Sequence, residues 1–435
     1  MKYFQPELET MSAADRRALQ SERLVSTVKY VYERQKPYRE KMDAIKLRPS
    51  DIKGIEDIWK LPYTQKSDLR NSYPFGMMAA TRKELVRLHA SSATTGKLTV
   101  SGYTKHDIDV WADCAARSLV MAGADEESIV HVCYGYGLFT GGLGMHYGAE
   151  KLGAIAVPAS AGNTQRQLQL LADFGADIIC CTPSYAIYLI EEMEKAGLKP
   201  GRDLKLKGGC FGAEAWTEEM RAEIERRLGI RACDIYGLSE ISGPGVSGDC
   251  EYKTGMHFQD DHYFPEIVDT ETLEPLPMGE RGELVITTLD RTGMPLIRYR
   301  TRDIAALDDT PCPCGRTTIR MKRITGRSDD MLIIRGVNVF PSQIESILLK
   351  DPYVQPHYHI NVDRVNNLDT LEIVVELSPD AMSDTMSEIE AIRSRLSAEM
   401  ASGISVTAKI TLVSPGTIER SEGKSKRITD RRKIK

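Results

Sequence analysis

Residues 129–157 read IVHVCYGYGLFTGGLGMHYGAEKLGAIAV, and this stretch decides the fold class. An apolar run at 129–134 is followed by a helical segment at 144–152, which Gly153 ends, and then by a second apolar run at 154–157. Two buried strands joined by a helix form a unit whose strands run parallel. The stretch therefore predicts an α/β fold.

The same alternation continues to residue 240. The expected elements are a helix from Asn163 or Thr164 to Gly175, strand 177–181, helix 183–197, strand 204–211, helix 217–229 and strand 232–235. In the first of these helices, Leu168, Leu171 and Phe174 fall on one face. Strands alternating with helices predict a largely parallel sheet covered on both faces, with ligands at the carboxyl ends of its strands.

The pattern changes beyond Ser239, where strands and turns replace helices. Residues 265–308 predict antiparallel strands separated by Pro- and Gly-rich turns, and we expect a β subdomain at about 241–325. Beyond residue 326, strands alternate with helices again. The expected elements are strand 331–336, helix 342–349, strand 371–377, helix 386–400 and strand 404–412. We therefore expect a large N-terminal domain at 1–326 and a small α+β domain at 327–435.

The composition narrows the class of protein. The chain has 435 residues, a net charge of −5, 41% hydrophobic and 27% charged residues, which is typical of a soluble protein with a sizeable core. The mild acidity favours neither nucleic acid nor an anionic membrane as a partner. The first 20 residues lack the pattern of a signal peptide, and no apolar segment reaches membrane-spanning length. Nine cysteines without an export signal favour a reducing compartment, so we expect a cytoplasmic protein.

Residues 91–99, SSATTGKLT, combine hydroxyls, a glycine and a lysine. These groups can surround a phosphate, although the stretch is not the common P-loop because Leu98 follows Lys97. An exposed polar loop would have the same composition. The glycine-rich run 135–144 fails the dinucleotide motif at Thr140, but its aromatic residues could wall an apolar pocket or simply fill a core.

Carboxylates follow or end expected strands at two further places. Glu240 closes YGLSE (236–240), directly after a strand, where it could hold Mg²⁺ on phosphates. Asp303 closes RYRTRD (298–303), where it could accept from ribose hydroxyls or form surface ion pairs. Near the end of the chain, residues 419–435 carry a net charge of +5, which fits either a solvated tail or a loop that delivers a lysine to a phosphate.

The cysteines divide into two groups. Cys312 and Cys314 share a tight Pro/Gly turn, and Cys250 and His257 lie upstream, so the four could bind one structural zinc ion. The spacing alone is equally compatible with no metal at these four residues. If a metal is bound, His262 and the six other cysteines are the alternative ligands. The other six lie in apolar segments and are expected to be small buried hydrophobic residues: Cys114, Cys133, Cys180, Cys181, Cys210 and Cys233.

Six segments together resemble the adenylate-forming acyl-CoA synthetases, and most closely the phenylacetate–CoA ligases. In chain order they are SSATTGK (91–97), GAEAW (212–216), YGLSE (236–240), RYRTRD (298–303), GRSDDMLIIRGVNVFPSQIE (326–345) and ERSEGKSKR (419–427). The resemblance runs over nearly the whole chain.

The resemblance implies a role for each matching residue. It implies that the ATP phosphates are bound by Ser91, Ser92, Thr94, Thr95, Gly96 and Lys97. It implies that the rest of the nucleotide is contacted by Gly212, Ala213, Glu214, Asp234, Tyr236, Gly237, Ser239, Asp303 and Arg327. Asp329 would be the hinge of a mobile small domain, Lys424 and Lys97 would assist catalysis, and Glu240 would hold Mg²⁺. The aryl acid would contact Tyr136, Phe139, Gly212 and Tyr236, and the zinc ligands would be Cys250, His257, Cys312 and Cys314.

Two positions depart from the family pattern. The phosphate loop has Ala93 where the family usually has glycine, and Leu98 where proline is common. The added methyl group restricts the backbone at position 93, which puts the rate of the nucleotide site in question.

The implied activity is an ATP-dependent, AMP-forming ligation of an aryl-acetic acid to coenzyme A, with Mg²⁺ and a structural Zn²⁺. Phenylacetate, hydroxyphenylacetate and indoleacetate are equally compatible with the sequence, and the oligomeric state is open, a homodimer included. An enzyme that loads a carrier-protein thiol would share every motif. A non-catalytic protein that binds an aryl acid or acyl-CoA is the alternative favoured by Ala93.

Overall fold

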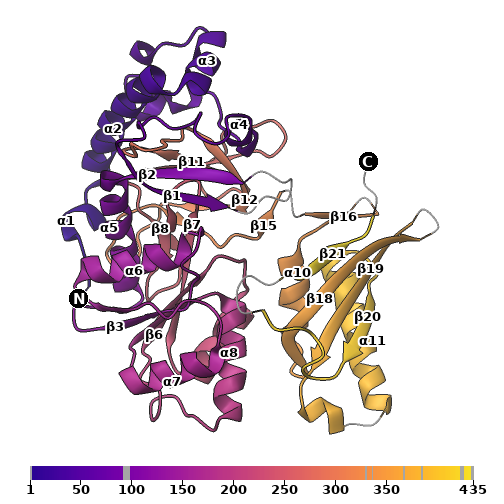
Figure 1. Cartoon of the computed structure of the whole chain (residues 1–435). Helices are drawn as coiled ribbons and strands as arrows, with labels where there is room; N and C mark the ends of the chain where they lie inside the picture. Colours follow the sequence, from indigo (N-terminus) through magenta and orange to yellow (C-terminus); the bar gives the residue numbers. More distant parts are fainter. Residues whose placement is uncertain are drawn as a thin grey trace. The chain divides into compact units, whose positions relative to one another are not determined.

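A computed structural model describes residues 2–91, 98–328, 331–335, 337–365, 368–383, 386–421 and 426–432. The chain forms two compact units, which are described separately (Figure 1). The first comprises Met1–Cys181, Asp203–Ala213 and Arg231–Ile324, and the second comprises Thr182–Arg202, Glu214–Ile230 and Thr325–Lys435. The expected boundary at residue 326 between two domains stays a prediction.

The main sheet of the first unit has nine strands, in the order β13-β14-β9-β8-β7-β6-β5-β3-β4. Five strands are parallel, as the alternation predicts: β3 (Ile129–Val132), β4 (Ile155–Val157), β5 (Ile178–Cys181), β6 (Gly208–Gly212) and β7 (Arg231–Leu238). Four antiparallel strands extend it: β8 (Gly243–Asp249), β9 (Met256–Phe258), β13 (Leu307–Asp308) and β14 (Arg320–Met321). The predicted α/β class is confirmed, and the sheet is mixed because the chain beyond Ser239 folds back onto β7.

Two smaller sheets complete the strands of this unit. The expected antiparallel strands form one of them: β10 (Tyr263–Val268), β11 (Gly282–Thr288) and β12 (Tyr299–Ala305). The other is a hairpin of β1 (Leu85–Ser91) and β2 (Thr99–Thr104). Tyr236 of the main sheet shares one apolar cluster with Leu284 and Tyr299 of the antiparallel sheet, so the two sheets pack through a common core.

Among the helices of the first unit, those at 141–152 and 164–174 were predicted from the sequence, the former with a start three residues later than observed. The helices of this unit are α1 (Pro6–Glu9), α2 (Ala13–Arg34), α3 (Lys36–Ala44), the 3₁₀ turns η1 (Pro49–Asp51) and η2 (Ile55–Lys60), α4 (Lys66–Asn71), α5 (Lys105–Met121), α6 (Gly141–Leu152) and α7 (Thr164–Phe174). Gly153 ends α6 with a φ of 88°, a conformation that favours glycine. The Asn163 side chain caps α7, but Phe174, expected on its apolar face, is 50% exposed because it lies in the last turn.

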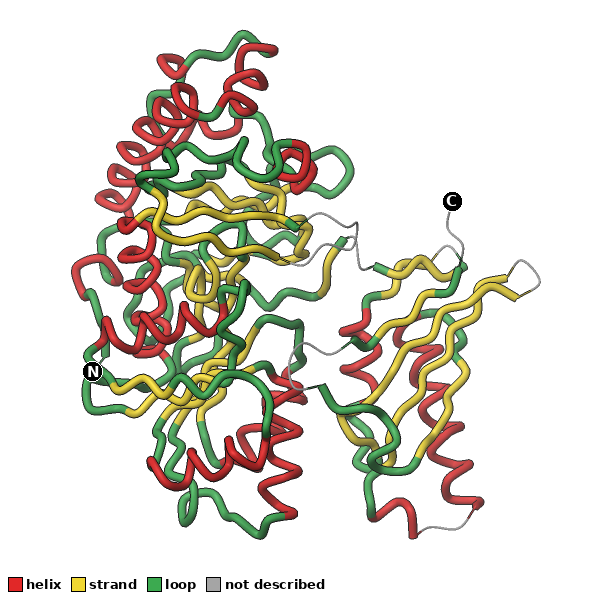
Figure 2. The backbone as a smooth tube through the Cα atoms, viewed as in Figure 1, coloured by secondary structure: helices red, strands yellow, loops and turns green. Residues whose placement is uncertain are grey.

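The second unit contains a four-stranded sheet in the order β20-β19-β18-β21 (Figure 2). Its elements are α8 (Pro183–Lys195), α9 (Glu218–Leu228), β15 (Gly326–Arg327), β16 (Leu332–Ile334), β17 (Val337–Val339), α10 (Pro341–Leu348), β18 (Val354–Val365), β19 (Leu368–Leu377), η3 (Asp380–Ser383), α11 (Met386–Ile404), β20 (Lys409–Val413) and β21 (Ile428–Asp430). Helices α10 and α11 pack on one face of this sheet, around a single apolar core.

The largest boundary error in this unit concerns the strand predicted at 404–412. The alternation from Ile404 to Leu412 predicts a strand, whereas α11 continues through Ile404 and β20 begins at Lys409. Ile404 lies four residues after Met400, so it also continues the apolar stripe of the helix, and it is buried there. Among the described residues, no helix is long and apolar enough to span a membrane.

Candidate functional site

Glu240 lies in the turn after β7, where the sequence predicts a cation-binding carboxylate. Its side chain is buried, and Oε1 accepts a hydrogen bond from the Ser91 hydroxyl at 3.0 Å. The Lys66 ammonium lies 3.2 Å from the same oxygen. The end of β1, the start of α4 and the turn after β7 therefore converge on one carboxylate oxygen.

Buried polar groups fix the backbone of this turn. The Arg291 guanidinium donates to the carbonyl oxygens of Glu240 and Ile241, and its Cζ atom lies 4.5 Å from the ring centroid of Tyr103. Tyr103 in turn donates to the carbonyl oxygen of Ser239 at 3.0 Å. Three consecutive carbonyl oxygens of the turn therefore accept from buried side chains, which fixes the backbone that carries Glu240.

Tyr236 and Asp303, which the resemblance assigns to the nucleotide, are in direct contact. The Tyr236 hydroxyl donates to Oδ2 of Asp303 at 2.7 Å, and both residues are buried. Asp303 lies inside β12 and not at its end as expected, because the strand continues to Ala305. The pair joins the carboxyl half of β7 to the antiparallel sheet.

Glycines allow the close approach of backbone at this edge of the main sheet. A Cβ at Gly212 would lie 2.1 Å from the carbonyl oxygen of Ile235, and one at Gly237 would lie 1.6 Å from that of Gly243. The next residue along, Ala213, has a φ of 71°, which is uncommon for a residue with a side chain. Substitution of either glycine would therefore displace the strand ends.

The other predicted nucleotide residues of the first unit are polar groups of β7 and its turn. Asp234 is buried in β7, and its backbone N–H donates to Asp249 Oδ2 at 3.2 Å. Ser239 Oγ lies 3.3 Å from Oγ1 of Thr140. Asp234 precedes the YGLSE motif, and Ser239 lies within it.

Two predicted nucleotide residues belong to the second unit. Glu214 accepts a hydrogen bond from the backbone N–H of Ser184 at 2.7 Å and another from its hydroxyl. Arg327 forms part of β15. Seven predicted site residues lie outside the described residues: Ser92, Thr94, Thr95, Gly96, Lys97, Asp329 and Lys424. Ala93, the departure from the family pattern, lies there too.

The three aromatic residues near the glycine-rich run have different environments. Tyr134 is a core residue, since it is buried and its hydroxyl donates to the carbonyl oxygen of Cys181 at 2.7 Å. Tyr136 is half-buried, and its hydroxyl lies 3.4 Å from Nδ1 of His146. Phe139 is 56% exposed. Tyr136 and Phe139 therefore remain available to a ligand, and Tyr134 does not.

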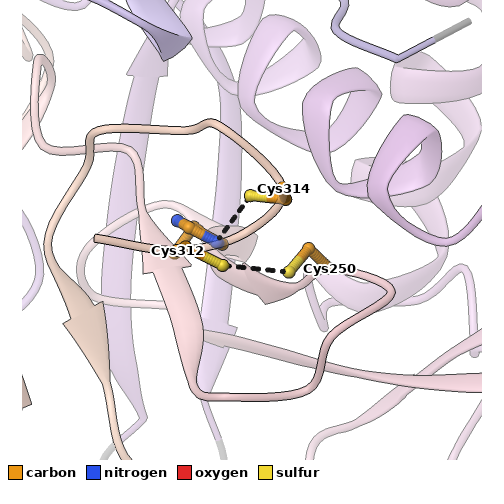
Figure 3. Close-up of side chains that lie close together, drawn as sticks. Cys250, Cys312 and Cys314 are labelled. Carbon is orange, nitrogen blue, oxygen red and sulfur yellow. Dashed lines mark hydrogen bonds between the residues drawn. The ribbon is translucent and has the colours of Figure 1, made fainter. Parts of the chain in front are cut away.

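The four predicted zinc ligands come together in the first unit (Figure 3). Cys250 follows β8, His257 lies in β9, and the two remaining thiols lie between β13 and β14. Their ligand atoms all lie within 4.8 Å of one another. The sulfur atoms of Cys250 and Cys312 are 3.7 Å apart, and Cys314 Sγ lies 3.4 Å from His257 Nε2. All four side chains are buried.

The surroundings of this cluster suit a metal-binding thiolate. Hydrogen bonds from Cys250 and then from His257 lower the pKa of Cys314 far below its usual range, despite its burial. The backbone N–H of Arg316 also donates to Cys314 Sγ at 3.4 Å. The other ring nitrogen of His257 bonds the Thr318 hydroxyl at 3.0 Å, which leaves Nε2 facing the sulfurs. Three sulfurs and one imidazole nitrogen are a donor set that fits tetrahedral zinc.

The structure also tests the predictions about His262 and the six cysteines outside the cluster. His262 is no part of the cluster, because its ring bonds Asp290 at 2.8 Å and lies 3.1 Å from Asp261. The six other cysteines are free and buried, as expected. Lys66 and Arg291 are polar site residues that the sequence analysis missed, since no local motif surrounds either of them.

Comparison with known proteins defines the class. Residues 102–289 match the family of AMP-binding enzymes, and residues 336–432 match the C-terminal domain of AMP-binding enzymes. The chain belongs to this family of adenylate-forming enzymes, and the resemblance expected from its motifs is confirmed.

The chain is also similar to individual members of this family that are named as acid–CoA ligases. The chain is 50% identical to the phenylacetate–coenzyme A ligase of Thermus thermophilus, over 99% of this chain and 100% of that protein. It is 49% identical to the phenylacetate–coenzyme A ligase of Escherichia coli, over 98% and 97%. Among solved structures, 2-hydroxyisobutyryl-CoA ligase with a bound adenylate has a TM-score of 0.93 at 30% identity, covering 99% of this chain and 93% of that chain.

Proposed function

We propose that this chain is an ATP-dependent, AMP-forming ligase that joins phenylacetate to coenzyme A. The observation that carries the proposal is its identity of 48–50%, over nearly full length, to four proteins named phenylacetate–coenzyme A ligase. The same likeness favours phenylacetate over hydroxyphenylacetate and indoleacetate. A cytoplasmic location and a homodimer stay predictions from the sequence.

In the first half-reaction, the substrate carboxylate attacks the α-phosphate of ATP and releases pyrophosphate. Glu240 supplies the oxygen donor that Mg²⁺ prefers, and its buried position next to the Ser91 hydroxyl supports this role. When bound, the metal offsets phosphate charge. Lys97 and Lys424 would stabilise the charge that develops on the phosphate oxygens.

In the second half-reaction, the CoA thiol attacks the acyl carbonyl of the adenylate, and AMP leaves. We assign Asp329 as the hinge about which the small domain turns, so that Lys424 withdraws before the thiol enters. A ligase 31% identical to this chain has been solved in a thioesterification state with its adenylate and CoA, which supports a two-state cycle of this kind.

The decisive test of the lysine is the variant Lys424→Ala. We expect it to lose at least about 10²-fold in pyrophosphate release, because one preorganised charge is removed from the transition state. It should still transfer the acyl group from supplied phenylacetyl adenylate to CoA. Lys426→Ala serves as the matched control, since Lys426 carries the same charge two residues away and is exposed. If both half-reactions survived in Lys424→Ala, the assigned role would be wrong.

We further propose that Cys250, His257, Cys312 and Cys314 hold a structural zinc ion. The four donors leave no open coordination position, so the metal would tie together the strands that carry them and take no part in catalysis. Protein purified without chelator should contain about one equivalent of zinc. A content well below one equivalent would rule out the site.

One alternative keeps the adenylation step and changes the thiol. A segment of a probable nonribosomal peptide synthetase is 29% identical to 46% of this chain, and such enzymes share the adenylation motifs. AMP release that depends on CoA and needs no carrier protein would exclude this alternative. Pyrophosphate release across a panel of aryl acids would likewise exclude a protein that only binds its ligand.

A further inference from the structure

Strand β12 does not pair regularly with β11. Between two regular stretches of the ladder, Leu284 of β11 alone faces three residues of β12, which are Thr301, Arg302 and Asp303. Two extra residues therefore form a bulge in β12. Bulges of this kind bend a strand and redirect a side chain, and they are frequent next to functional sites.

The side chain of Thr301 replaces the ladder bonds that the bulge interrupts. Its hydroxyl donates to the carbonyl oxygen of Leu284 at 2.8 Å and accepts from the backbone N–H of Asp303 at 3.0 Å. A single hydroxyl thus bridges the two strands and fixes the backbone of Asp303. Valine at position 301 would keep the shape of the side chain and lose both bonds.

The middle residue of the bulge carries the backbone distortion. Arg302 has a φ of 70°, a region that residues with a side chain rarely adopt. Its guanidinium donates to Gln65 Oε1 at 3.3 Å and lies 3.5 Å from Oε2 of Glu283. Glu283 is fully buried and also binds Arg300 at 2.7 Å, so the bulge is anchored to a fixed carboxylate.

We infer that this bulge positions Asp303 to recognise the ribose of ATP, with Thr301 and Arg302 as positioning residues. The bulge directs the Asp303 carboxylate to the Tyr236 hydroxyl at 2.7 Å, and both side chains are buried. A carboxylate fixed in this way can accept hydrogen bonds from vicinal hydroxyls and so distinguish a ribonucleotide from its deoxy analogues. The inference rests on the proposed function, and on the contact between Asp303 and the nucleotide that the family resemblance implies.

The test compares the dissociation constants of ATP and 3′-deoxyATP, measured by calorimetry on the full chain. The wild-type protein should bind ATP at least about tenfold more tightly than 3′-deoxyATP, because one hydrogen bond to a charged group contributes roughly this factor to affinity. Thr301→Val should bring this ratio down to that of Asp303→Ala, whereas Thr301→Ser should keep the wild-type ratio. A role of Thr301 in stability alone would leave the ratio unchanged.

A second pair of variants separates the backbone of Arg302 from its side chain. Arg302→Val places a β-branched residue at a positive φ and should reduce the preference for ATP over 3′-deoxyATP. Arg302→Gly adopts the same φ freely and should retain more of this preference than Arg302→Val does. Lys46→Val is the matched control, because Lys46 has a φ of 58° in an exposed turn. It should leave the ratio unchanged.

The outcomes distinguish the inference from the proposed function. If Thr301→Val and Arg302→Val unfold cooperatively, bind ATP and keep the wild-type ratio, the bulge does not position Asp303. If the wild-type protein binds ATP without discriminating against 3′-deoxyATP, the inference alone is wrong. If the wild-type protein does not bind ATP at all, the proposed function fails as well.

Discussion

The first unit contains two polar sites that are built in opposite ways. At the Cys250–His257–Cys312–Cys314 cluster, all four donor atoms lie within 4.8 Å of one another and face a common point. At Glu240 and Asp303, each carboxylate instead faces a protein donor: Ser91 and Lys66 for the former, and Tyr236 for the latter.

This difference fits the roles proposed for the two sites, a structural zinc site and a site of turnover. If the three thiols and the imidazole bind zinc as proposed, they leave no position for a substrate. Carboxylates that bind hydroxyls and an ammonium can exchange those partners for a ligand and recover them after product release. The two sites should therefore respond differently to mutation, one in stability and the other in rate.

The variant Glu240→Gln tests the turnover side of this comparison and should have the largest effect. The amide keeps the shape of the side chain and loses the charge, so pyrophosphate release should fall by about 10²–10³-fold. The midpoint of thermal unfolding should change little, because the amide can still accept from Ser91. A rate within threefold of wild type, about 0.7 kcal/mol, would show that Glu240 holds no catalytic cation.

The variant Cys250→Ser tests the structural side. Loss of one ligand should lower the zinc content and reduce the free energy of unfolding by about 3 kcal/mol, since metal-binding energy contributes to folding. Adenylation per folded molecule should be retained, in contrast to Glu240→Gln. Cys233→Ala is the control: this thiol is buried in β7, outside the cluster, and its loss should leave the zinc content unchanged.

The elements that the sequence predicts well are those encoded by neighbouring residues. Helix α7 begins at the Asn163 cap and ends at Gly175, as expected, because both signals act within one turn. The approach of Cys250, His257, Cys312 and Cys314 to one another was also predicted, whereas the zinc ion itself stays a proposal. The antiparallel pairing of β8 with β7 was not predicted, because neither strand contains a signal for its partner.

The missed site residues share the same cause. Lys66 contacts Glu240 across 174 positions of the chain, and Arg291 binds the carbonyl oxygens of Glu240 and Ile241 from 51 and 50 positions away. The position of Asp303 inside β12 depends on a bulge that appears only when β12 pairs with β11. Contacts of this kind follow from topology and register, which a local pattern does not encode.

The variant Lys66→Met should have a smaller effect at the turnover site. Lys66 lies 3.2 Å from Glu240, but its side chain is 36% exposed, so water screens much of the interaction. We expect the KM for ATP to rise by no more than about fivefold, with kcat changing less. Lys60→Met is the matched control, because Lys60 is bound to Asp57 on the surface at 2.7 Å. An unchanged KM would mean that Lys66 does not contribute to the positioning of Glu240.

The last prediction concerns the pH dependence of stability. In the turn between β9, which carries His257, and β10, the adjacent carboxyls of Asp260 and Asp261 have opposite pKa shifts. Burial alone would raise the pKa of Asp261, but His262 and Arg117 hold it well below the usual range. Burial raises the pKa of Asp260 to about 7, and the nearby Arg16 offsets only part of this shift.

Between pH of about 4 and 7, the folded protein therefore holds a proton on Asp260 that the unfolded chain has lost. The free energy of unfolding should then decrease as the pH rises through this range, by at most about 1.4 kcal/mol per pH unit, and level off above pH 7. Asp260→Asn should reduce this slope, which chemical denaturation at several pH values would measure, and the buried Glu266, whose pKa burial also raises, contributes to the remainder. Asp261 is ionised throughout this range, so an unchanged slope in Asp260→Asn would place the proton on another group.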